Sequence, residues 1–269
     1  SWPISSQSLW QHGPSCLLWS LLLYSLVRAN EKAEQHHQKW LVLAGLVGGL
    51  AICCRLINFA AMPLVLLAVF LRWKSRGTAS FLACFLFVLI LLFSYNFYFF
   101  GTWNGGLAEV LQLRWFLDRV EGGVWETPLI VGVLGNLISP SRGLFIFSPF
   151  LIFSIWGMIR VWREPDPSFL IYRILMWAPI VLLLIFGKYT VWWGGNSHYG
   201  PRYQIEMLPM LVFMMGLGWT QFAKRPALRA LFGVFLVYAV FVQWIGAFCY
   251  PSDWAVEPVS LAVDKDRLW

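Results

Sequence analysis

The sequence predicts an all-α fold, a polytopic bundle of membrane-spanning helices. Of its 269 residues, 59% are hydrophobic and 12% are charged, whereas about a quarter of the residues of soluble domains are charged. The mean hydropathy is +0.66. Several apolar runs reach the length of about 20 residues that a helix needs to cross a bilayer. We therefore expect residues 1–269 to form a single transmembrane domain.

About eight spans are expected along the chain. The second and third are separated by a break around Arg55, Asn58 and Pro63. A shorter apolar piece, 128–138, is expected to be re-entrant or interfacial. The expected spans are 15–29, 40–55, 57–73, 79–100, 143–162, 169–188, 203–222 and 227–248.

One further helix is expected outside the bilayer core. Residues 107–120 place apolar side chains on one side of a helix and polar ones on the other. This pattern predicts an amphipathic helix in the outer interface, anchored by Trp115 and Phe116. A plain connecting helix is the alternative.

The basic residues predict the orientation. Eleven of them lie in four short loops, which the positive-inside rule places in the cytoplasm. This spread over loops also argues against nucleic acid as a partner, despite the net charge of +7. The loops are 28–39, 72–78, 160–168 and 223–229. The segments expected on the exoplasmic side are 1–14, 101–142, 189–202 and 249–269.

Arg202 closes the stretch His198-Tyr-Gly-Pro-Arg, directly before an apolar run. Gly200 and Pro201 predict a helix start with Pro201 at the first helical position, which puts Arg202 in the first turn. A helix amino end already carries partial positive charge and unpaired N–H groups, so an arginine there favours a bound anion. The guanidinium adds a planar, bidentate donor. Arg202 is therefore predicted to bind a phosphate at the outer lip of the membrane.

A purely structural role for Arg202 is the alternative. Glu206 lies four residues further on and could pair with it, in the weaker cation-first order. An exposed pair of this kind would contribute about 0.3–0.5 kcal/mol. Pro209 is expected to disrupt the helix one turn in, because its ring would clash with the carbonyl of Ile205.

The N-terminal stretch has a similar layout. His12, Gly13 and Pro14 come just before the first expected span, so His12 and His198 are predicted on one exoplasmic cavity wall. Two histidines could bind a divalent metal, but spacing alone defines no metal site, so the cofactor is left undefined. The residues expected to line the cavity are Trp10, Gln11, His12, Trp193, His198 and Tyr203.

Two other arginines are candidates for the same phosphate. Arg142 follows the turn-forming Ser139 and Pro140 and precedes the fifth expected span. Arg55 lies within an apolar stretch, where an ionisable residue usually faces a cavity or a partner. Snorkelling toward the outer interface is the alternative for Arg55.

Three stretches together resemble membrane glycosyltransferases of the GT-C type, and among them the polyprenyl- or dolichyl-phosphate-sugar-dependent mannosyltransferase-like proteins of bacteria. These stretches are GGNSHYGPRYQIEMLP, SLWQHGPSCLLW and NLISPSRGLFIFSPFL. The resemblance implies a sugar donor on a lipid phosphate, membrane lipid as a partner, and inverting chemistry on the exoplasmic side of a bacterial-type plasma membrane. It carries the lipid-phosphate role over to Arg202, Arg142 and Arg55.

The resemblance also implies a catalytic acid in the first exoplasmic loop, upstream of Ser1. We therefore expect the sequence to be part of a longer chain, and the catalytic base is unknown. No Walker loop, GxGxxG or nucleophile motif is present in the sequence. The alternatives to sugar transfer are a lipid or solute transporter or flippase, which would use broken helices and charges at the bilayer midplane, and a non-catalytic scaffold subunit of a membrane assembly.

Overall fold

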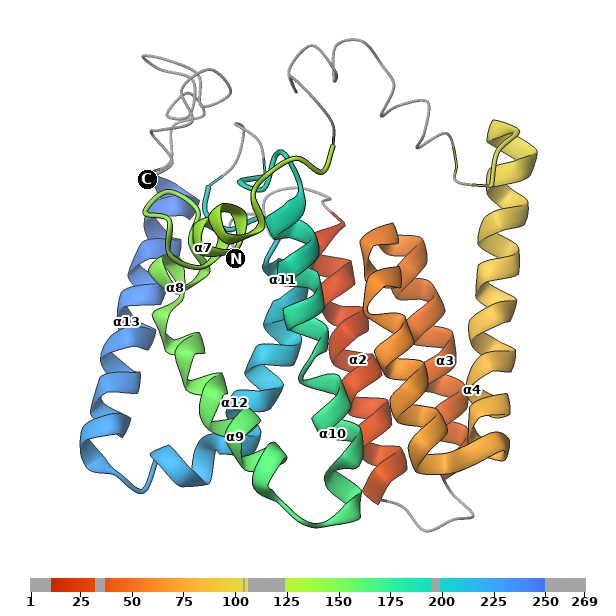
Figure 1. Ribbon diagram of the computed structural model, residues 1–269, viewed down its shortest axis with the longest axis horizontal. Coiled ribbons are helices and arrows are strands. Elements are labelled where there is room, and N and C mark those ends of the chain that lie inside the picture. The colour runs from red at the N-terminus through yellow and green to blue at the C-terminus, as the bar shows by residue number, and fades with distance from the viewer. Residues whose placement is uncertain (1–10, 32–36, 104, 106–123, 195–198, 250–269) are drawn as a thin grey trace. The chain divides into compact units, whose positions relative to one another are not determined.

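The computed structural model describes residues 11–31, 37–103, 105, 124–194 and 199–249 (Figure 1). Every regular element in these residues is helical, which confirms the all-α prediction for this part of the chain. The amphipathic helix expected at 107–120 lies outside the described residues. The chain divides into two compact units, one formed by residues 14–123 and the other by residues 1–13 and 124–269.

The 14–123 unit contains three long helices, and the longest of them is broken. Lys74 has non-helical backbone angles (φ 53°, ψ −154°), so α4 consists of two helical segments that meet there. These segments correspond to the third and fourth expected spans. The left-handed Gly101 ends α4, and its N–H bonds to the carbonyl of Phe97. The elements are α2 (His12–Glu31), whose first two residues are assigned to the other unit, α3 (His37–Cys54), η1 (Leu56–Ala60) and α4 (Met62–Phe100).

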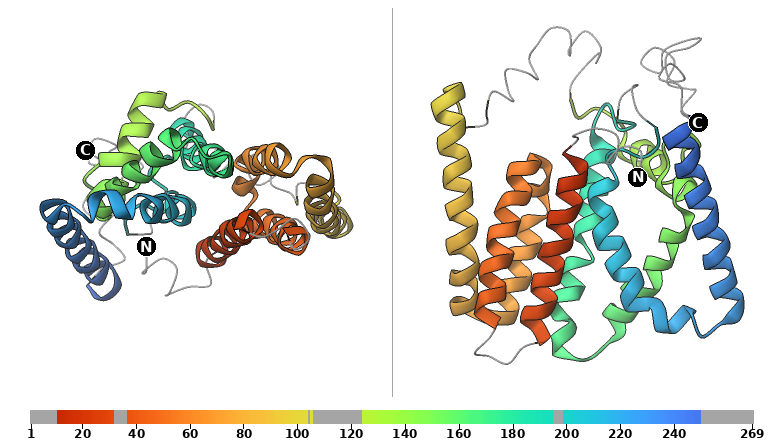
Figure 2. Two further views of the ribbon diagram at one scale, coloured as in Figure 1. Left: turned by 90° about the horizontal axis from the view of Figure 1, so that it is seen from below. Right: turned by 180° about the vertical axis from the view of Figure 1, so that it is seen from behind.

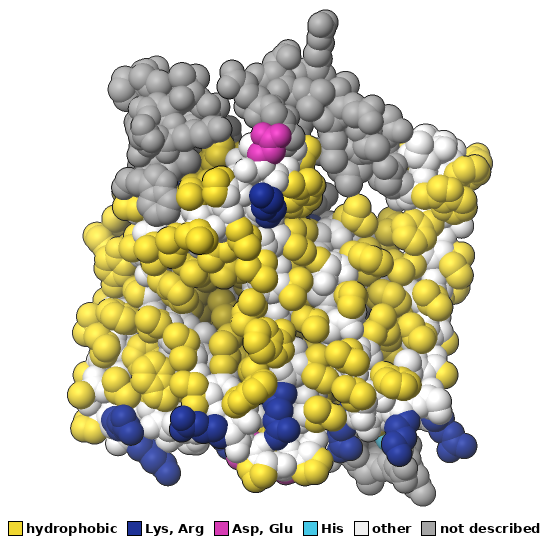
Figure 3. Space-filling model, in the orientation of Figure 1, with side chains coloured by type: hydrophobic (Ala, Val, Ile, Leu, Met, Phe, Trp, Pro, Cys, Tyr) yellow, Lys and Arg dark blue, Asp and Glu magenta, His cyan; other side chains and the backbone are white. Residues whose placement is uncertain are grey.

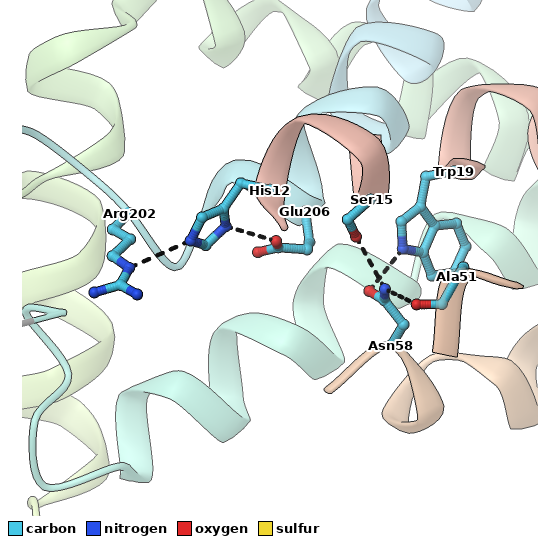
Figure 4. Close-up of polar contacts among 7 residues, drawn as sticks. All are labelled: His12, Ser15, Trp19, Ala51, Asn58, Arg202 and Glu206. Carbon is cyan, nitrogen blue, oxygen red and sulfur yellow. Dashed lines mark hydrogen bonds and ion pairs between the residues drawn. The ribbon is translucent and has the colours of Figure 1, made fainter. Parts of the chain in front are cut away.

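A buried asparagine explains the break between the second and third expected spans. Asn58 in η1 is fully buried and donates to Ser15 Oγ (2.9 Å) and to the carbonyl of Ala51 (2.7 Å). Its Oδ1 accepts from Trp19 Nε1 at 2.9 Å (Figure 4). One amide thus links α2, α3 and η1, and its hydrogen-bonding groups are satisfied within the protein, as burial requires.

Glycines let α3 pack closely against both segments of α4 (Figure 2). A Cβ atom on Gly45 would overlap the carbonyl oxygen of Phe81, and one on Gly49 would lie 2.7 Å from the Cβ of Val88. Gly48 faces the side chain of Met62. Gly45 and Gly49 form a GxxxG pair, which membrane helices use where their backbones approach each other.

The other unit contains shorter and more interrupted elements. The expected span 143–162 is divided among α8, η2 and α9, because Ser148 is non-helical and Pro149 starts a new turn. Close glycine contacts join α9 to α12 at Gly157 and Gly218. The elements are α7 (Leu129–Ile138), α8 (Leu144–Phe147), η2 (Pro149–Phe153), α9 (Ser154–Arg163), η3 (Pro167–Phe169), α10 (Leu170–Leu175), α11 (Ala178–Lys188), η4 (Ile205–Met207), α12 (Leu208–Phe222) and α13 (Pro226–Phe248).

Five helical segments in the described residues are long and apolar enough to cross a membrane, which indicates an integral membrane protein. The expected number of eight is not reached by this criterion. One reason is that the 39 residues of α4 form one segment here but two in the expectation, and another is the division of span 143–162. The five segments are His37–Cys54, Met62–Phe100, Pro167–Lys188, Ile205–Phe222 and Pro226–Phe248.

Within each unit, the basic loops gather at one end (Figure 3). In the 14–123 unit, Arg72 Nε donates to Asn30 Oδ1 at 2.7 Å, which joins the loops 28–39 and 72–78. In the other unit, Arg160 at the end of α9 donates to the carbonyl of Leu217 at 2.6 Å, near the loop 223–229. Each pair of loops thus shares one end, as the positive-inside argument requires.

The close α3–α4 contact predicts that Gly45→Ala lowers stability. The added Cβ meets backbone rather than a movable side chain, and such overpacking costs about 1–3 kcal/mol. Gly233→Ala on α13 is the matched control, because no atom lies within 4 Å of its Cβ position and alanine favours a helix. Thermal unfolding in detergent is the measurement, and equal melting temperatures for the two variants would contradict the packing.

Candidate functional site

The segment before α12 is a left-handed turn followed by a 3₁₀ turn. Gly200 has φ +74°, and regular helix begins only with η4 at Ile205 and α12 at Leu208. The prediction that Pro201 starts a helix with Arg202 in its first turn is therefore wrong. So is the expected disruption at Pro209, which lies in the first turn of α12, where a missing N–H costs no hydrogen bond.

Three ionisable side chains form a row at this point (Figure 4). Nε of Arg202 contacts Nε2 of His12 at 3.3 Å, and Nδ1 of His12 contacts Oε1 of Glu206 at 2.8 Å. His12 is 2% exposed and Glu206 is fully buried. All three residues belong to the unit formed by residues 1–13 and 124–269. We call these three side chains the Arg202–His12–Glu206 row.

The geometry assigns the proton on His12. A guanidinium only donates hydrogen bonds, and a neutral imidazole has one donor and one acceptor nitrogen. Because Nε2 faces a donor in Arg202, it must be the acceptor. Nδ1 then carries the proton, and its N–H donates a hydrogen bond to the carboxylate of Glu206. The Arg202–His12–Glu206 row is thus consistent with a neutral imidazole between a cation and a carboxylate.

Two further groups position the guanidinium of Arg202. Its Nη1 donates to the carbonyl of Gly194 at 3.3 Å, and Gly194 has φ +91°, a conformation that glycine adopts without strain. The guanidinium carbon lies 6.0 Å from the ring centre of Tyr203. Tyr203 in turn stacks on Phe186 of α11, with 4.7 Å between ring centres and 1° between the planes. The aromatic pair therefore supports one side of the guanidinium.

The segment is also anchored to α7. Gln204 is buried, and its Nε2 donates to Oδ1 of Asn136. Asn136 is fully buried and donates to the carbonyl of Gly132 at 2.8 Å. Residues 202–206 are thus held by α7 through Gln204 and by His12 through Glu206. This double attachment fixes the backbone from which Arg202 extends.

Tyr189, which follows α11, contacts Tyr203 edge-on with 5.8 Å between ring centres. Burial raises the pKa of the Tyr189 phenol to about 12, and the neighbouring Tyr203 adds to the rise, whereas the charge of Arg202 opposes it. Tyr189 therefore keeps its proton at neutral pH, and its side chain is hydrogen-bonded to Tyr203, the residue next to Arg202.

The other two predicted phosphate ligands lie on other segments of the chain. Arg142 is 1% exposed in the turn between α7 and α8, where its backbone N–H bonds to the carbonyl of Ser139. Arg55 directly precedes η1 and belongs to the 14–123 unit. A shared phosphate-binding role for these two arginines and Arg202 stays a prediction.

The predicted cavity wall is described only in part. Trp193 is buried, Tyr203 is half-buried and Gln11 is exposed. Trp10 and His198 lie outside the described residues, so the pairing of His198 with His12 stays a prediction. In the parts of the chain that the structure covers, no group of three or more His, Cys, Asp and Glu side chains could hold a metal ion.

Sequence reasoning missed the central contact of the site. The sequence places Glu206 only as a neighbour of Arg202 four residues away, whereas in the structure His12 connects the two residues. His12 and Glu206 are 194 positions apart, and no local spacing rule links residues at that separation. The available signal was the placement of both residues at the predicted outer lip, which suggests proximity without assigning partners.

The chain was compared with models of protein families. Residues 12–79, about a quarter of the chain, match the family model described as the N-terminal domain of the protein O-mannosyl-transferase TMEM260. The matched region begins at His12 and runs through α2, α3, η1 and the first segment of α4. This match supports a mannosyltransferase-like membrane protein. Neither the curated proteins nor the solved structures contain a match to the chain.

The Arg202–His12–Glu206 row predicts unequal effects of two substitutions at Glu206. Glu206→Leu removes the acceptor of a buried imidazole N–H and should lower the free energy of unfolding by about 1–3 kcal/mol. Glu206→Gln keeps an oxygen acceptor and should cost less. Thermal unfolding in detergent measures both, with the exposed Glu126→Gln as a control. If Glu206→Leu is as stable as the control, His12 does not depend on this carboxylate.

Proposed function

We propose that this chain contributes to a membrane glycosyltransferase of the GT-C type, which transfers a sugar from a lipid-phosphate-linked donor to an acceptor hydroxyl on the exoplasmic side. The observation that carries the proposal is the guanidinium of Arg202, held by His12, Gly194 and Tyr203 at one end of a membrane-helix unit. Because residues 12–79 match a domain of a protein O-mannosyl-transferase, we propose mannose as the transferred sugar.

The exoplasmic placement is supported by the direction of α12. This helix begins next to Arg202 and ends at Phe222, beside the basic loop 223–229. Its 15 residues rise by about 1.5 Å each, or roughly 22 Å in all, which separates the two ends by most of a hydrocarbon core. If the basic loops are cytoplasmic, Arg202 lies near the outer headgroups, at the depth of a lipid phosphate.

The chemistry suits an arginine at this place. The acceptor oxygen forms a bond to the anomeric carbon of the sugar, while the bond from that carbon to the phosphate oxygen breaks. The acceptor proton passes to a base, and the leaving lipid phosphate gains negative charge. A preorganised cation stabilises that charge in the transition state more than in the ground state. Displacement in one step would invert the anomeric centre.

The shape of the guanidinium suits a phosphate ligand. It has five N–H donors in a planar fork, and the contacts to His12 and Gly194 use Nε and Nη1. The fork geometry matches two phosphate oxygens. The helix amino end is not part of this proposal, since Arg202 precedes η4 rather than lying within it.

Arg202→Ala is predicted to lower transfer by the full-length protein by about 10- to 150-fold. A hydrogen bond to a charged group contributes about 1.5–3 kcal/mol, and each 1.36 kcal/mol is a factor of ten in rate. Arg202→Lys should recover only part of the activity, because lysine lacks the planar fork. The measurement is the rate of sugar transfer from a polyprenyl-phosphate-linked mannose.

The exposed Arg163 at the end of α9 provides the control. Arg163→Ala removes the same charge from the basic end of the same unit and should leave the rate unchanged. Full activity of Arg202→Ala, or an equal loss in Arg163→Ala, would rule out the phosphate-binding role of Arg202.

A further inference from the structure

His12 touches both charged members of its row, although it carries no charge itself in that geometry. Its Nε2 accepts from Arg202 at 3.3 Å, and its Nδ1 donates to Glu206 at 2.8 Å. It is also 2% exposed at the first turn of α2. A buried imidazole with one donor and one acceptor in use can keep both contacts in only one protonation state.

We propose that His12 is a positioning residue, which in its neutral form holds the guanidinium of Arg202 in place for the donor phosphate and on protonation releases it. This role rests on the proposed function, because it needs the lipid phosphate as the ligand of Arg202. It makes donor binding weaken as the pH falls through the titration of His12.

The switch follows from the atoms that face the imidazole. A second proton would go to Nε2, which points at an N–H of Arg202. The acceptor is then lost, and two like charges stand in direct contact. On the other side, the protonated ring forms a full ion pair with the carboxylate of Glu206. Protonation thus strengthens the contact to η4 and breaks the contact to Arg202.

The neighbouring groups are consistent with this switch. Among the described contacts of the imidazole, two are to charged groups, Glu206 in η4 and Arg202 in the segment before it. Tyr189, whose pKa is raised to about 12, keeps its proton throughout the range in which a histidine usually titrates. An unperturbed histidine changes its charge between about pH 5 and 8, which sets the range over which the proposal is tested.

A role as general base is less compatible with the geometry. A base must present its lone pair to the acceptor hydroxyl at hydrogen-bonding distance. The lone pair of Nε2 instead points at Arg202. His12 therefore acts through Arg202, and its substitution should change donor binding before it changes the chemical step.

Glutamine separates these possibilities. Its amide oxygen can accept from Arg202, and its NH₂ group can donate to Glu206, so His12→Gln reproduces both contacts without titrating. His12→Ala removes both. The polyprenyl phosphate headgroup titrates as well, but it does so equally for every variant. The difference between wild type and His12→Gln therefore isolates the imidazole.

The experiment measures binding of undecaprenyl phosphate to the full-length protein in detergent, by tryptophan fluorescence between pH 5 and 8. We expect His12→Gln to bind like wild type at pH 8 and about tenfold more tightly than wild type at pH 5, since loss of one charge-assisted contact is worth a factor of about ten or more. His12→Ala should bind about tenfold more weakly than wild type at pH 8. Thermal unfolding of each variant checks that it is folded.

Three other results would each contradict the positioning role of His12 or the proposed function. If wild type and His12→Gln show the same pH dependence, the positioning role is wrong while the proposed function stands. If His12→Gln binds normally but has lost sugar transfer, His12 is a base and the positioning role is again wrong. If wild type binds no undecaprenyl phosphate at any pH, the proposed function fails and this inference fails with it.

Discussion

The burial of Glu206 is the constraint on which the site depends. A carboxylate with no exposed surface is costly unless its oxygens accept hydrogen bonds. His12 supplies one such hydrogen bond through Nδ1, and its ring has a second nitrogen, Nε2, on the other side. Satisfying Glu206 with one nitrogen therefore directs the other toward Arg202. The position of the guanidinium is in this sense a consequence of the burial of an acid.

The surrounding backbone supports the same arrangement. Gly194, whose carbonyl accepts from Arg202, and Gly200, two residues before Arg202, both adopt positive φ angles that glycine tolerates without strain. Glycine contacts between α7 and α11, at Gly132 and Gly187, bring together the helices that hold Asn136 and Phe186. The polar anchor of Gln204 and the aromatic support of Tyr203 then follow from the close approach of these two helices.

The helices were largely predictable, because apolar runs dominate the sequence and each run of sufficient length became helical. The residues at which the helices begin were harder to predict. Pro201 and Pro209 are both acceptable in a first turn, and sequence rules favoured the wrong one. The break at Asn58 was visible as a polar residue in an apolar stretch, but its contacts to Ser15 and Trp19 needed the fold.

The sequence predicted two of the residues that form the candidate site, but not which of its side chains contact each other. Arg202 and His12 stood out because a cation or an imidazole beside an apolar run needs a partner. The identity of that partner depends on long-range packing, which no local spacing encodes. Glu206 was therefore assigned to its neighbour in sequence, whereas its hydrogen bond goes to a residue 194 positions away.

The central claim is that a lipid phosphate is the leaving group of a sugar transfer. The most direct measurement compares two donors with the purified full-length protein, polyprenyl-phosphate-linked mannose and a nucleotide-linked mannose, each with an acceptor peptide that contains serine and threonine hydroxyls. The predicted result is transfer from the lipid-linked donor and none from the nucleotide-linked donor. Transfer from the nucleotide-linked donor alone, or from neither, would contradict the claim.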